Sequence, residues 1–456
     1  MLRLSTYSEN CLCYLTTEGV KRDEVKPRNL EDLIAIMMRL DLDQLWICPG
    51  NRLNSLQEKD LSYDQDAYDV RIRMIRNPDG RITFPLPDIA ASITFFPRAA
   101  RASRRPRIIV FPARDTWQWD KYAPCIDAQT ALGALFYLQR ELGENFYHNP
   151  GVIGRLLIKS SVHKRDWLAP AGVDFSWLTS EAGYNLAYSH LPEHLPSFPH
   201  LHVWDKNSMY IARCTSLKLP TGTPRHLTGR EAQKAADAGC YWGIWHTRGI
   251  AGELEPSPVR ASQQWISQPI LEYLAERTGI PNIDEAWIWP EEQTHALLKK
   301  PMYQMWNMRL LFREGGPEFR HDGARGLAEY SAKRIATCSI GLMASSTTKQ
   351  IAPGFYRPEW RVAIVESAKV ALLRQVEAIR ARTGALPALI QVDAVGYFSD
   401  IPNPYDAFPE FARDGLGGWK LAYSQKLTDQ EIRSIWTGQS SGGIMRVLKL
   451  RSKGDE

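Results

Sequence analysis

Short apolar segments that alternate between helical and strand-like spacing constrain the fold of this chain most. Early in the chain, the apolar positions of 30–38 recur at helical intervals, a strand-like run follows at 45–48, and a second helix begins after Asp127. Strands interspersed with helices of this length are typical of an α/β domain. The same alternation continues downstream, with strands expected at 201–205, 240–246 and 388–393 and helices at 269–276, 291–313, 327–343 and 358–384. The sequence predicts a multidomain protein of mixed α/β and α+β class.

Length and composition narrow the class further. The 456 residues exceed what one hydrophobic core supports and suggest about three domains or subdomains. No segment approaches the roughly 20 apolar residues that cross a bilayer, and the first residues lack the apolar run of a signal peptide. Seven scattered cysteines without a C-x-x-C pair favour a reducing compartment. We therefore expect a cytoplasmic protein with no membrane partner.

The net charge of +5, from 56 basic and 51 acidic residues, is compatible with a polyanionic partner but does not identify one. A local concentration of arginine is more specific. It lies in a loop interrupted by Ala, Ser and Pro rather than by acidic residues, and such a loop is either a solvated surface or a contact with phosphates. Its members are Arg98, Arg101, Arg104, Arg105 and Arg107.

Several common site signatures are missing or poorly placed. The chain has no P-loop, no G-x-G-x-x-G between a strand and a helix, and no G-x-S-x-G. His190 to His194 match H-x-x-E-H, but Pro192 and Pro196 oppose the helix that a zinc site of this type needs. We expect a solvated loop there.

Two apolar strands, far apart in the sequence, each end in an aspartate. Leu201-His202-Val203-Trp204 leads to Asp205, and Leu389-Ile390-Gln391-Val392 leads to Asp393. Two such carboxylates could meet across a sheet and share two Mg²⁺ or Mn²⁺ ions for in-line phosphoryl transfer. From spacing alone, structural caps at the ends of strands remain the alternative.

Four segments in order resemble motifs of family B DNA polymerases of the protein-primed type. Asp205-Lys206-Asn207-Ser208-Met209-Tyr210 is similar to motif A, D-x-N-S-M-Y. Leu219 to Pro224 follows and resembles P-x-G-x-P. Lys333 to Gly341 is similar to motif B, K-x-x-x-N-S-x-Y-G. Leu416-Gly417-Gly418-Trp419-Lys420 is similar to L-G-x-W-K. The resemblance spans about 200–425 and extends more faintly to the N-terminal part.

The chain departs from this family at two motifs. Motif C, Y-x-D-T-D-S, fits in two registers, and we prefer the one in which Gln391 replaces the first aspartate and Asp393 is the second. Motif B has Thr337, Cys338 and Ile340 where the family has Asn, Ser and Tyr. The family's D-x-E on an opening exonuclease strand is not found, so proofreading is expected to be absent.

The resemblance implies a division of the chain and a set of roles. It implies a degenerate exonuclease-like (RNase H-like) domain at 1–180, a family-B-like palm at 181–400 with fingers at about 211–345, and a thumb-like region at 401–456. It implies that Asp205 and Asp393 bind two metal ions, that Lys333 meets the incoming triphosphate and that Tyr210 walls the sugar pocket. Lys420 would join the arginine loop in contacting DNA.

The expected function is therefore template-directed nucleotidyl transfer in the replication of a mobile element, with a terminal or priming protein as a candidate further partner. The alternative from another class is a non-catalytic, polymerase-derived DNA-binding protein, such as an initiator or regulator.

Overall fold

The computed structural model of this chain consists of two compact units. The first comprises 1–161 and 303–340, and the second comprises 162–302 and 341–456. The structure describes residues 4–8, 11–16, 19–25, 30–40, 42, 44–47, 68–73, 91–97, 107–110, 117–119, 122, 126–147, 149–162, 170–178, 187–189, 199–248, 254, 256–258, 263–315 and 322–431.

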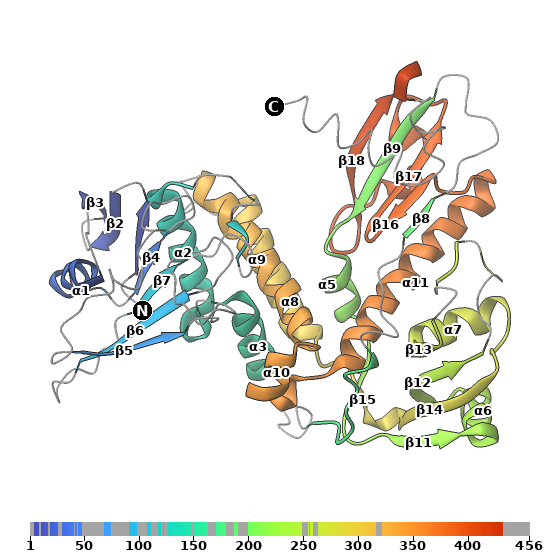
Figure 1. Cartoon of the computed structure of the whole chain (residues 1–456). Coiled ribbons are helices and arrows are strands. Elements are labelled where there is room, and N and C mark those ends of the chain that lie inside the picture. The colour runs from blue at the N-terminus through green and yellow to red at the C-terminus, as the bar shows by residue number, and fades with distance from the viewer. Residues whose placement is uncertain are drawn as a thin grey trace. The chain divides into compact units, whose positions relative to one another are not determined.

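The first unit is built on a seven-stranded sheet in the order β3-β2-β1-β4-β7-β6-β5 (Figure 1). The pairs β1–β4 and β4–β7 are parallel, and the other pairs are antiparallel. Helix α1 follows β3, and α2 packs on β1 and β2. The strands are β1 Leu4–Ser8, β2 Cys11–Thr16, β3 Gly19–Glu24, β4 Gln44–Ile47, β5 Tyr68–Arg73, β6 Ala91–Pro97 and β7 Arg107–Val110; the helices are α1 Leu30–Arg39, α2 Ala128–Leu142 and α3 Pro150–Ser161.

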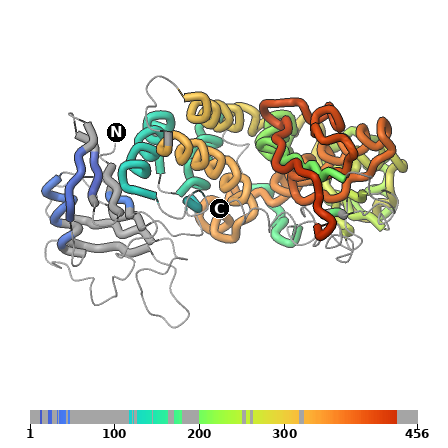
Figure 2. The backbone as a smooth tube through the Cα atoms, turned by 90° about the horizontal axis from the view of Figure 1, so that it is seen from above, coloured from blue at the N-terminus to red at the C-terminus, as the bar shows by residue number. Residues whose placement is uncertain are grey.

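Helices α8 (Lys299–Glu314) and α9 (Asp322–Leu342) contribute most of their length to the first unit. In Figures 1 and 2 they lie beside the teal helices α2 and α3. Small residues allow this close packing: a Cβ built on Gly133 of α2 would come 2.7 Å from Ala324 Cβ, and one on Gly154 of α3 would come 2.5 Å from Ser339 Cβ. The helix expected over 291–313 begins only at Lys299, because a 3₁₀ turn (Glu291–Gln293) and the short strand β15 (Thr294–His295) come first in this range.

The second unit contains a five-stranded antiparallel sheet in the order β18-β9-β17-β16-β8. The long helix α11 contributes apolar side chains to the same core as Trp204, Val395 and Trp419 of this sheet. The strands are β8 Ala187–Ser189, β9 His200–Lys206, β16 Leu389–Gln391, β17 Ala394–Ser399 and β18 Trp419–Lys426; the helices are α5 Met209–Cys214, α10 Ser346–Ile351, α11 Pro358–Thr383 and α12 Pro404–Ala407.

A second sheet of this unit, β11-β14-β12-β13, is also antiparallel and shares that core through α6 and α7. The buried Glu366 of α11 joins the two parts, since its carboxylate accepts hydrogen bonds from Ser267 N (2.7 Å), Ser267 Oγ (2.6 Å) and Gln263 Nε2 (2.9 Å). The elements are β11 Arg225–Thr228, β12 Tyr241–Thr247, β13 Trp265–Ser267, β14 Ile283–Pro290, α6 Gly229–Ala238 and α7 Gln268–Arg277; β10 Leu219–Pro220 pairs separately with β15 Thr294–His295.

Local signals placed several helix ends correctly. Asp127 caps α2 by accepting from Thr130 N at 2.9 Å. Helix α11 begins at Pro358 and ends at Thr383, and the capping residue Gly384 has a φ of 73° that suits glycine. The region from residue 401 onwards was expected to be thumb-like, and within it β18 pairs with β9. No helix in the described part of the chain is long and apolar enough to span a membrane.

Candidate active site

Asp205 lies near the end of β9, at the centre of three neighbouring strands. In the register of the sheet, Lys420 of β18 is opposite Asp205 on one side and Ala394 of β17 is opposite it on the other. Residues directly opposite each other in an antiparallel pair point to the same face of the sheet. The structure thus brings a predicted metal ligand, Asp205, together with a predicted DNA contact, Lys420, whose side chain is exposed.

Asp393 lies in the tight turn between β16 and β17. Gln391 pairs with Ala394, which leaves Val392 and Asp393 as the turn residues. Val392 has a φ of 59°, a left-handed conformation that is rare for a β-branched side chain. The strand expected at 388–393 is therefore shorter than predicted, and Asp393 occupies a hairpin turn rather than the end of a strand.

A backbone hydrogen bond ties this turn to β9. Lys206 N donates to the carbonyl oxygen of Asp393 at 2.8 Å, immediately beyond Asp205. The turn that carries Asp393 therefore lies beside the end of the strand that carries Asp205, despite their separation in sequence. Both side chains are half-buried.

The turn that follows β9 is fixed by the segment before β18. Asn207 N donates to Gly418 O and Gly417 N donates to Asn207 O, both at 2.8 Å. Gly417 has a φ of 73°, and a Cβ on Gly418 would lie 2.2 Å from the carbonyl oxygen of Arg413. The two glycines of the L-G-G-W-K segment are thus needed for this close approach.

Backbone strain accompanies both aspartates. Ser208, three residues after Asp205, has a φ of 52°, and Val392 directly precedes Asp393. Among the described residues, Gln118 is the one other non-glycine with positive φ. Sparsely populated backbone conformations cluster at functional sites, where the surrounding structure imposes them. The placement of these two residues is consistent with such a site.

Tyr210, on the first turn of α5, is electrostatically coupled to this site. Burial, followed by the negative charge of Asp393, raises the pKa of its hydroxyl to about 12. The positive charge of Arg361, on α11, opposes it. Sequence reasoning missed Arg361, because nothing in the pattern of α11 distinguishes it from the other basic residues of that helix.

Lys206 faces away from the aspartates. Successive side chains of a strand point to opposite faces, so Lys206 lies on the face opposite Asp205. It is 8% exposed, and its Nζ lies 4.2 Å from the ring centroid of Trp419, its register partner on β18. Burial, together with the smaller effect of the Arg213 charge, lowers the pKa of its ammonium group to about 8. Lys206, the second charged residue of the motif-A-like segment, therefore lies on the face of the sheet that carries Trp419 and packs into the core.

The other predicted site residues belong to the first unit or lie outside the described residues. Lys333 is exposed on α9, in the first unit. Arg98, Arg101, Arg104 and Arg105 lie outside the described residues, and Arg107 begins β7.

The carboxylates of Asp205 and Asp393 are the expected ligands of Mg²⁺ or Mn²⁺. Across the residues whose placement is described, no three His, Cys, Asp or Glu side chains gather in a metal-binding group. A carboxylate on β9 and another in the neighbouring turn nevertheless fit Mg²⁺, which is commonly bound through one or two carboxylates, with substrate phosphates and water as the remaining ligands. His202, close by on β9, is held by Ser424 Oγ and the carbonyl oxygen of Ile401, each at 2.9 Å, and has a structural role.

Comparison with solved structures identifies proteins of similar fold. Phi29 DNA polymerase complexed with single-stranded DNA matches with a TM-score of 0.52 at 13% identity, over 93% of this chain and 85% of that chain. Its complex with primer-template DNA matches with a TM-score of 0.53 at 12% identity, over 93% and 84%. Its ternary complex with primer-template DNA and incoming nucleotides gives 0.51 at 13%, over 93% and 86%. No family model and no curated protein matches the sequence.

Proposed function

We propose that this protein binds DNA and carries out template-directed nucleotidyl transfer at Asp205 and Asp393. The observation that carries the proposal is the backbone bond between Lys206 N and Asp393 O, which joins the motif-A-like strand to the motif-C-like turn. The polymerase-like fold supports it, because the solved structures of similar fold include complexes with primer-template DNA.

The residues singled out in the sequence have distinct proposed roles. Asp205 and Asp393 would hold two divalent ions, which when bound supply charge stabilisation for the entering and leaving oxygens. Lys420, exposed opposite Asp205, would neutralise a phosphate of the DNA backbone. Tyr210 would form a wall of the sugar pocket, as the resemblance of its segment to motif A implies. Lys333 would meet the triphosphate, as the resemblance of its segment to motif B implies.

A primer-extension assay with Mg²⁺ or Mn²⁺ tests this proposal directly. We expect metal-dependent incorporation on a primed template and its disappearance with EDTA. If the purified protein binds DNA but extends no primer with either ion, the non-catalytic alternative replaces the proposal. That alternative, an initiator or regulator derived from a polymerase, is favoured by Gln391 standing where the family has an aspartate.

We further expect no metal-dependent 3′ to 5′ degradation of single-stranded DNA. The reason is the opening strand β1, Leu4–Ser8, which contains no acidic residue to bind the ions of an exonuclease. The measurement is the decay of an end-labelled oligonucleotide with the full chain and Mg²⁺ or Mn²⁺. Progressive shortening that EDTA stops would refute the expectation.

The arginine loop at 98–107 is proposed to bind the DNA backbone. Replacing Arg101, Arg104 and Arg105 together by Ala should weaken binding to all sequences alike. It should also reduce the slope of log K against log salt by about one unit for each phosphate that is no longer neutralised. Fluorescence anisotropy over a salt series measures both effects. An unchanged slope would indicate a solvated surface instead.

A further inference from the structure

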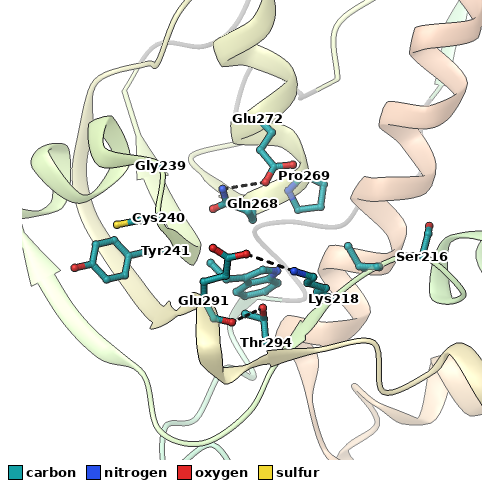
Figure 3. Close-up of a pocket in the computed structure, with 12 residues that line it drawn as sticks. Ser216, Lys218, Gly239, Cys240, Tyr241, Gln268, Pro269, Glu272, Glu291 and Thr294 are labelled. Carbon is teal, nitrogen blue, oxygen red and sulfur yellow. Dashed lines mark hydrogen bonds and ion pairs between the residues drawn. The ribbon is translucent and has the colours of Figure 1, made fainter.

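A cavity with a volume of about 390 Å³ lies in the second unit, apart from Asp205 and Asp393 (Figure 3). Its lining comes from the segment after α5, the beginning of β12, the first turns of α7 and the segment around β15. The volume lies near the lower limit of ligand pockets and suits one small group rather than a whole nucleotide. No residue proposed above for nucleotidyl transfer lines it.

Two carboxylates face this cavity from different elements. Glu272 comes from α7 and Glu291 from the segment after β14, and in Figure 3 they lie on either side of Gln268. The Gln268 side chain is nine-tenths buried, and its Oε1 accepts from Trp245 Nε1 at 2.9 Å. This bond fixes the amide so that Nε2 donates to Glu272 Oε1 at 3.2 Å. The carboxylate of Glu272 is thereby held in place by the buried side chain of Gln268.

The cation among the described lining residues, Lys218, neutralises the site only weakly. Lys218 Nζ lies 3.4 Å from Glu291 Oε1, and the two side chains are 61% and 71% exposed. Ion pairs this exposed contribute about 0–1 kcal/mol, so Glu291 can exchange Lys218 for another cation at little cost. With Glu272, Glu291 and Lys218 charged, the lining carries a net charge of −1, which disfavours phosphates.

An aromatic side chain completes the lining. Tyr241 and Trp242 both border the cavity, but consecutive side chains of β12 point to opposite faces. The Tyr241 ring points away from Glu272 and Glu291 in Figure 3 and has the guanidinium carbon of Arg225 5.8 Å from its centroid, so we take Trp242 as the aromatic group of the site. Aromatic rings attract cations through their quadrupole, and a carboxylate adds charge-assisted hydrogen bonds.

We propose that this cavity binds a small organic cation carrying a guanidinium or primary ammonium group. Glu272 and Glu291 accept its N–H groups, and the Trp242 side chain covers its alkyl part. The proposal is independent of nucleotidyl transfer, so the two can fail separately.

Cys240 provides a reporter for this site. It is an exposed free thiol in the lining of the cavity, whereas Cys13 and Cys214 are buried. Iodoacetamide labelling of the full chain, read at the Cys240 peptide by mass spectrometry, measures its accessibility. The probes are n-butylguanidinium and the neutral n-butylurea, which share size and shape. We expect the first, and not the second, to slow labelling.

Charge-neutralising variants identify the groups responsible. Glu272→Gln and Glu291→Gln should each raise the half-protecting concentration of n-butylguanidinium by about tenfold, as expected when one charge-assisted hydrogen bond is removed. Glu276→Gln, one turn further along α7, is the matched control and should leave it unchanged, because Glu276 instead accepts from Arg374 at 2.7 Å. Glu291 is largely exposed, so its variant tests the site even if Glu272→Gln impairs folding.

Capped arginine distinguishes the source of the cation. Protection by N-acetylarginine amide at similar concentrations would indicate a basic side chain of a protein, and protection by n-butylguanidinium alone would indicate a free small cation. Either result supports the cationic site. Equal protection by n-butylurea, no protection by any probe, or protection unchanged in the Glu272→Gln/Glu291→Gln double variant would overturn it.

Discussion

Asp205→Asn or Asp393→Asn is expected to lower nucleotide incorporation by several orders of magnitude while leaving DNA binding nearly unchanged. Each substitution removes a negative charge that would compensate a bound divalent ion. Because the Lys206 N to Asp393 O bond joins the strand of Asp205 to the turn of Asp393, we expect the two residues to act as one unit. The double variant should then be scarcely less active than either single variant. Single-nucleotide incorporation and anisotropy of labelled DNA measure the two properties.

The preferred motif C register gives this prediction a matched control. Gln391→Asp restores the family residue at an exposed position two residues before Asp393, and it should be tolerated. Independent, multiplicative reductions in the double Asp variant would contradict a shared metal site. Full activity in Asp393→Asn would contradict the register itself.

The second large effect concerns stability. Glu359→Gln is expected to lower the free energy of unfolding by about 3–5 kcal/mol, because it leaves the guanidinium of Arg357 buried without a countercharge. Arg357 and Glu359 are both 0% exposed and form an ion pair at the start of α11. Arg357 also donates to Pro220 O at 2.8 Å, and its guanidinium carbon lies 4.1 Å from the ring centroid of Trp360. Urea unfolding measures the change.

An exposed ion pair of the same unit is the control. Lys349 Nζ lies 2.7 Å from Asp174 Oδ2, but the two side chains are 47% and 53% exposed. Asp174→Asn should therefore cost less than about 1 kcal/mol. Replacing both Arg357 and Glu359 by apolar residues should cost less than the two single substitutions added, because neither charge is then left alone in the core. Equal effects at the buried and exposed pairs would contradict this account.

The sequence by itself determined much of the secondary structure, because the signals are local. The cap at Asp127, the proline at the start of α11 and the glycine at its end depend on a few neighbouring residues. The apolar side chains of β9 were likewise enough to predict a strand. Where local signals conflict with pairing, prediction was less accurate, as at the helix expected over 291–313, whose first residues include β15, the partner of β10.

Only the tertiary structure decided how the two aspartates are placed. The sequence presented both as ends of apolar strands, but strand pairing puts Asp205 on β9 and Asp393 in a turn that Val392 strains. It also decided that Lys206 is buried over Trp419, that Lys420 lies opposite Asp205, and that Arg361 acts on Tyr210. The physical reason is that sheet register and burial depend on residues far apart in the chain, whose pairing no local pattern specifies.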